Sequence, residues 1–117
     1  MEIRQIVKDD VTVVHLAGDI WGRHGEPERI RAVVSELVEK DSVRVVFNLS
    51  QVRLISSIGI GMLIAGYKAF TDAGGAVAIA EPSDPIKPVF RVLRGPFEVF
   101  DSEDEAVNSV RGGSPTS

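Results

Sequence analysis

The sequence predicts a single α/β domain with a four- to five-stranded mixed β-sheet and about four α-helices. Short runs rich in β-branched residues alternate with longer segments of helical periodicity, in the order ββαβαβαβα. This order is typical of strands joined by helical crossovers. The length of 117 residues fits one domain, and a content of 44% hydrophobic and 26% charged residues matches an ordinary globular protein.

The first half of the chain is expected to hold three strands and one helix. Residues 2–7 and 11–17 indicate two strands joined by a polar turn. A helix is expected with Pro27 in its first turn, where a proline is well accommodated, because apolar residues then recur every three or four positions. These apolar positions are Ile30, Val33, Val34, Leu37 and Val38. Residues 43–49 are rich in valine and predict a central strand.

The second half is expected to alternate helices with short strands. The longest helix spans residues 57–73 and ends at Gly74-Gly75. Residues 76–80 and 97–100 predict strands, and residues 86–93 and 103–110 predict helices. We expect the domain to occupy residues 1–111 and residues 112–117 to form a flexible polar tail.

Charge and residue content exclude several classes of function. The net charge of −4 argues against direct binding of nucleic acid, and no apolar run is long enough for membrane insertion or a signal peptide. We therefore expect a cytoplasmic protein. Cysteine is absent and the two histidines, His15 and His24, have no metal-ligand spacing, so we expect neither a metal nor a cofactor. His15 lies among apolar strand residues, which favours a packed structural role, and no catalytic motif indicates an enzyme.

The most informative segment is residues 48–62, where a serine pair separates the central strand from the longest helix. A serine is a favoured helix N-cap, so capping alone accounts for one member of the pair, Ser56 or Ser57. One side of the helix should face the core, with Ile60, Leu63, Ile64, Tyr67 and Phe70.

The opposite side of this helix is also apolar. It carries Ile58, Met62, Ala65, Gly66, Ala69 and Ala73, where a surface helix would be polar. Periodicity leaves two interpretations open: another helix covers this side, or a partner docks on it.

Four segments resemble the STAS domain family of bacterial anti-sigma factor antagonists. Asn48-Leu49-Ser50 followed by Ser56-Ser57-Ile58-Gly59-Ile60-Gly61-Met62-Leu63 is similar to the family signature. Leu16-Ala17-Gly18-Asp19-Ile20, the pair Gly74-Gly75 and the segment 97–106 match in the same order along the chain. The resemblance covers about 105 residues and implies the STAS fold.

The resemblance implies that Ser57 is the phosphorylated residue. In such systems the unphosphorylated antagonist binds an anti-sigma factor that is a serine kinase, phosphorylation dissociates the complex, and a serine phosphatase restores binding. Three positions depart from the family: Ser56 replaces its usual acid, Ile58 its small polar residue, and Trp21 another common acid.

The expected partner-binding residues surround Ser57. They are Asp19, Trp21, Ser56, Ile58, Gly61, Met62 and Ala65. Trp21 should be exposed in the free protein and covered by the partner. The alternative is a phosphorylation-independent STAS scaffold or adaptor, in a signalling assembly or a cytoplasmic lipid-transport complex. An enzyme or nucleotide-binding protein is the third and least favoured interpretation.

Overall fold

The computed structural model describes residues 1–93 and 95–111, and within them it confirms the predicted order of strands and helices. The predicted tail, residues 112–117, lies outside the described residues. Observed bounds differ from the predicted ones by two residues at most. The elements are β1 (Glu2–Lys8), β2 (Val11–Ala17), α1 (Glu26–Glu39), β3 (Arg44–Gln51), α2 (Ser57–Asp72), β4 (Ala76–Ala80), α3 (Lys87–Leu93), β5 (Glu98–Phe100) and α4 (Glu103–Val110).

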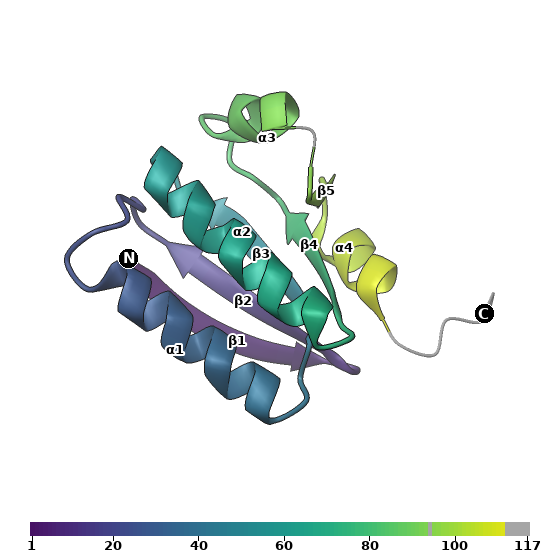
Figure 1. The fold of residues 1–117 in the computed structure, drawn as a ribbon. Helices are drawn as coiled ribbons and strands as arrows, with labels where there is room; N and C mark the ends of the chain where they lie inside the picture. The colour runs from purple at the N-terminus through teal and green to yellow at the C-terminus, as the bar shows by residue number, and fades with distance from the viewer. Residues whose placement is uncertain (94, 112–117) are drawn as a thin grey trace.

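The five strands form one mixed sheet in the order β1-β2-β3-β4-β5. Strands β1 and β2 form an antiparallel hairpin, and β2 through β5 run parallel. Figure 1 shows α1 and α2 on one face of the sheet and α4 on the other. Because the parallel strands end at the same edge, the loops after β2 and β3 lie side by side there.

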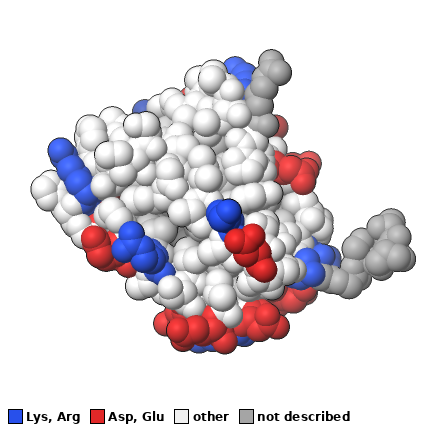
Figure 2. All heavy atoms as spheres, in the orientation of Figure 1, with Lys and Arg blue, Asp and Glu red and all other residues white. Residues whose placement is uncertain are grey.

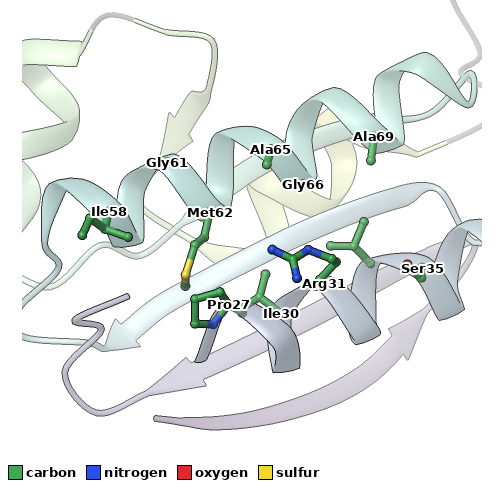
Figure 3. A pocket seen from close by; sticks show the side chains of 11 residues that line it. Pro27, Ile30, Arg31, Ser35, Ile58, Gly61, Met62, Ala65, Gly66 and Ala69 are labelled. Atoms are coloured by element: carbon green, nitrogen blue, oxygen red, sulfur yellow. The ribbon is translucent and has the colours of Figure 1, made fainter. Parts of the chain in front are cut away.

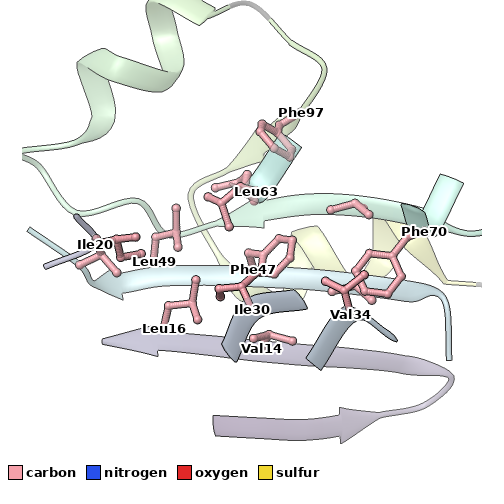
Figure 4. Packing of buried hydrophobic residues seen from close by; sticks show 14 of the residues in the cluster. Val14, Leu16, Ile20, Ile30, Val34, Phe47, Leu49, Leu63, Phe70 and Phe97 are labelled. Carbon is pink, nitrogen blue, oxygen red and sulfur yellow. The ribbon is translucent and has the colours of Figure 1, made fainter. Parts of the chain in front are cut away.

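The main hydrophobic core lies between the sheet and the α1–α2 layer (Figure 4). The predicted core side of α2 is confirmed: Ile60, Leu63 and Phe70 are buried, and Ile64 and Tyr67 are half-buried against the same cluster. Burying a leucine side chain of this kind stabilises a fold by about 1.5–3 kcal/mol. This packing holds the α2 axis, and so the residues at its N-terminus, in a defined position.

A polar cluster ties the opposite face of the sheet to the start of α4. Asn48 Nδ2 donates to Glu103 Oε1 at 2.8 Å, Lys8 also bonds this carboxylate, and His15 Nε2 lies 3.0 Å from Glu103 Oε1. Burial raises the pKa of Glu103, but the hydrogen bonds from Lys8 and Asn48 outweigh it and hold this pKa below its ordinary value. The structure thus places His15 in a packed position against Glu103.

The described residues contain neither a membrane-spanning helix nor a metal site. No helix within residues 1–93 and 95–111 is both long and apolar enough to cross a bilayer. In the same part of the chain, no three His, Asp or Glu side chains gather as ligands for a metal ion.

Candidate functional site

The two serines at the start of α2 have different surroundings. Ser56 is the N-cap: its backbone is extended, and its Oγ accepts a hydrogen bond from the amide of Gly59 at 3.0 Å. Ser57 is the first helical residue and is exposed. Its hydroxyl makes no hydrogen bond to any described residue. Capping therefore accounts for Ser56 and leaves the Ser57 hydroxyl available for chemistry.

The electrostatic setting of Ser57 suits an added negative charge. The first turn of α2 carries no acidic side chain. Its unbonded backbone amides and the helix dipole give this end a partial positive charge, equivalent to roughly half an elementary charge. A phosphoryl group on Ser57 would therefore be tolerated by the folded chain itself.

The loop after β2 lies against this N-terminus. The amide of Ile20 donates to the carbonyl of Leu54 at 2.9 Å, and the amide of Ser56 donates to the carbonyl of Ile20 at 2.9 Å. Ser56 Oγ then donates to the carbonyl of Trp21 at 2.7 Å. The Trp21 side chain is 43% exposed, with the Arg23 guanidinium 5.1 Å from the centre of its ring system. The structure therefore brings Trp21 and the serine pair together, as expected.

Glu26, which the sequence analysis did not single out, fixes the shape of this loop. Its buried carboxylate accepts hydrogen bonds from the amides of Trp21, Gly22 and Arg23 at 3.0, 2.8 and 3.4 Å. Burial raises the pKa of Glu26, but the amide hydrogen bonds outweigh it and lower this pKa below its ordinary value. The available signal was an acid directly before Pro27 at the start of a helix, positioned to reach back to unbonded amides.

An apolar groove of about 580 Å³ runs between α1 and α2, beginning beside Ser57 (Figure 3). Four predicted partner-binding residues line it from α2: Ile58, Gly61, Met62 and Ala65. The α1 wall was not foreseen from the sequence; it consists of Pro27, Ile30, Arg31, Val34 and Ser35. Figure 3 shows Met62 pointing across the groove toward Pro27. Helix α1 thus covers the second apolar side of α2 only in part, and Ile58 and Ala65 on that side remain exposed.

Gly66 and Asp19 differ in their relation to the groove. Gly66, expected on the second apolar side of α2, lines the groove but is buried; an added Cβ there would lie 3.4 Å from Val34 Cγ2 and 3.6 Å from Phe47 Cζ. Asp19 is exposed on the loop after β2 but does not line the groove.

The surface around the site carries few charges. Figure 2 shows a mostly uncharged area over the N-terminal half of α2, with acidic side chains gathered toward the lower edge of the same view. Ile58, in the first turn of α2, is 62% exposed. Large apolar side chains left exposed around a groove are typical of a protein interaction surface.

Comparison with known proteins assigns the chain to a family. The STAS domain family matches residues 2–106. An anti-sigma F factor antagonist of Paenibacillus polymyxa is 23% identical over 101 residues, covering 86% of this chain and 84% of the relative. A crystal structure from Thermotoga maritima has a TM-score of 0.82 at 22% identity, covering 93% and 94% of the two chains. The Bacillus cell fate determinant SpoIIAA in its phosphorylated form has a TM-score of 0.71 at 23% identity, covering 94% and 100%. This chain belongs to the STAS domain family.

Proposed function

We propose that this chain is an anti-sigma factor antagonist that is switched off by phosphorylation of Ser57. The observation that carries the proposal is the exposed, unbonded Ser57 hydroxyl, placed between the Trp21 loop and the apolar groove. The relative named an anti-sigma F factor antagonist supports it, as does the likeness to SpoIIAA in a phosphorylated form. Binding to the anti-sigma factor would free its sigma factor and so regulate transcription.

The proposed switch consists of two steps, phosphorylation of Ser57 from ATP and later hydrolysis of the phosphoserine. Ser57 Oγ attacks the γ-phosphorus of ATP bound to the anti-sigma factor kinase, the bond from that phosphorus to the β,γ-bridging oxygen breaks, and ADP leaves. The hydroxyl proton passes to a base of the kinase. A serine phosphatase reverses the modification with water, which restores the hydroxyl and releases inorganic phosphate.

The position of Ser57 makes this modification act on binding more than on folding. A phosphoryl group adds about −1.5 to −2 charges. In the free chain this charge meets water and the positive end of α2. Under a docked partner it would lie beside Ile58 and Met62 with water excluded, where an unpaired charge is costly. The free fold is therefore preserved while the interface is lost.

A pair of substitutions at Ser57 tests the proposal with a purified kinase-type anti-sigma factor. Ser57→Ala should bind the partner and become insensitive to ATP. Ser57→Asp should fold normally but lose at least about 2–3 kcal/mol of binding free energy, a factor of about 30 to 150 in affinity. Binding is measured by isothermal titration calorimetry in the presence of ADP or ATP, and phosphate incorporation by intact-mass spectrometry.

The adjacent serine provides the matched control. Ser56→Ala should reach the same final phosphate stoichiometry as the parent, while Ser57→Ala should incorporate none. Phosphate on Ser57→Ala, or parent-like affinity of Ser57→Asp, would refute the switch. Partner binding that ignores both phosphate and Ser57→Asp would instead identify a phosphorylation-independent STAS scaffold.

A further inference from the structure

One hydroxyl group joins the start of α2 to the Trp21 loop. Ser56 Oγ accepts from the Gly59 amide at 3.0 Å and donates its proton to the Trp21 carbonyl at 2.7 Å. Both bonds need a group that accepts and donates at once. A hydroxyl does this, an ionised carboxylate only accepts, and a methyl group does neither.

A second contact joins the same two elements on the other side of Ser57. Gly22 packs so closely against Ile58 that an added Cβ would lie 2.4 Å from Ile58 Cγ2. Gly22 also has a φ of +79°, a conformation that side-chain-bearing residues rarely adopt. Ser57 therefore lies between two residues, Ser56 and Ile58, that both contact the Trp21 loop.

The far end of the loop is fixed independently of α2. The Glu26 carboxylate holds the amides of Trp21, Gly22 and Arg23 from α1. The Trp21 carbonyl, by contrast, is held by Ser56 alone among the described side chains. Loss of the Ser56 proton donor would therefore free the Trp21 carbonyl, while the Trp21 amide stays bonded to Glu26 and the backbone hydrogen bond between Ser56 and Ile20 remains.

We propose that Ser56 is a positioning residue that couples the state of Ser57 to the Trp21 loop, and this inference rests on the proposed function. A phosphoryl group on Ser57 competes for the first-turn amides, including the Gly59 amide that Ser56 now occupies. Ser56 then loses its fixed orientation, and the Trp21 carbonyl loses its hydrogen bond to α2. One modification thereby alters both sides of the docking surface.

Trp21 is the sole tryptophan in the sequence, so its fluorescence reports directly on the loop. The test measures acrylamide quenching of the free, unphosphorylated full-length chain. In Ser56→Ala and Ser56→Asp the quenching constant should rise, by at most about twofold, because Trp21 is now 43% exposed and loses the hydrogen bond that holds its carbonyl. Ser56→Thr, which keeps both donor and acceptor, should match the parent. Ser56→Asp distinguishes the roles of the two hydrogen bonds, because an ionised aspartate can still accept from the Gly59 amide but cannot donate to the Trp21 carbonyl.

Ser102 provides a matched control for the loss of a helix cap. It is the N-cap of α4 and its Oγ accepts from the Glu105 amide at 3.1 Å. Ser102→Ala should lower stability like Ser56→Ala but leave Trp21 quenching unchanged. Parent-like quenching in Ser56→Ala and Ser56→Asp would overturn the proposal and show that Ser56 acts only as the N-cap of α2.

The coupling itself is tested with a charge at Ser57. Ser57→Asp should raise Trp21 quenching in the parent background and add nothing in the Ser56→Ala background. Additive effects in the double variant would overturn the coupling. These measurements need no partner, so they can succeed or fail separately from the antagonist function, which only partner binding and phosphate transfer decide.

Discussion

Replacing Glu26 with glutamine tests the loop that carries Trp21. The Glu26 side chain accepts two short hydrogen bonds, at 3.0 and 2.8 Å, and a longer one at 3.4 Å. Hydrogen bonds to a charged group contribute about 1.5–3 kcal/mol each and neutral ones about 1 kcal/mol. Glutamine keeps a neutral oxygen, so each short bond should lose about 0.5–2 kcal/mol. We expect Glu26→Gln to lower the free energy of unfolding at pH 7 by about 1–4 kcal/mol.

This loss should depend on pH with a defined sign. The pKa of Glu26 is lowered in the folded chain, since its amide hydrogen bonds outweigh the effect of burial. An acid of this kind contributes stability that is present above its unfolded pKa and is lost as pH falls through its folded pKa. Glutamine does not titrate, so the difference between the parent and Glu26→Gln should shrink below about pH 4. Glu103, whose pKa is also lowered, is common to both proteins and cancels.

Urea unfolding at a series of pH values measures this difference, with far-UV circular dichroism and Trp21 fluorescence as probes. Glu28→Gln is the matched control, because Glu28 is also acidic and in the first turn of α1 but is exposed. It should change stability by about 0.5 kcal/mol or less. Equal losses for Glu26→Gln and Glu28→Gln at pH 7, or a Glu26→Gln loss that persists at low pH, would refute the reasoning.

Three further predictions concern α2 and its surroundings. Leu63→Ala should cost about 2–5 kcal/mol in urea unfolding and Ile58→Ala less than about 1 kcal/mol, because the first is buried and the second exposed; similar losses would mean that α2 faces the wrong way. Trp21 emission should shift to shorter wavelength when the anti-sigma factor binds, and an unchanged spectrum would place Trp21 outside the interface. Gly61→Ala should raise stability by about 0.5–1 kcal/mol in urea unfolding and weaken partner binding in calorimetry.

The arrangement of elements was predictable because local patterns determine it here. Alternating and helical periodicities located the strands and helices to within two residues. The core side of α2 followed from spacing alone, since Leu63 and Phe70 lie on the same face of the helix, two turns apart. Helical periodicity also placed Ile58 and Met62 together on the second apolar side of α2, and both line a single groove.

The remainder of the site depends on contacts between distant segments. Both serines fit a helix start equally well by local rules, and only the position of the Gly59 amide selects Ser56 as the cap. The α1 wall of the groove, including Arg31, depends on how two helices lie side by side, which a single helical wheel does not contain. The burial of Gly66 on that side has the same origin, since Val34 of α1 faces it.

The three glycines of α2 differ in whether packing within the fold explains them. Each glycine inside a helix costs about 0.5–1 kcal/mol relative to alanine. Gly59 is accounted for by packing, because an added Cβ would lie 2.9 Å from Ile20 Cγ2, and Gly66 is buried, with an added Cβ 3.4 Å from Val34 Cγ2. Gly61 has no such reason: an added Cβ meets nothing within 4 Å, yet this position lines the groove. A helix residue that lowers stability without serving the fold fits a surface kept open for another molecule. Gly61→Ala should therefore move stability and partner binding in opposite directions, and a variant that gains in both would show that the groove does not receive the partner.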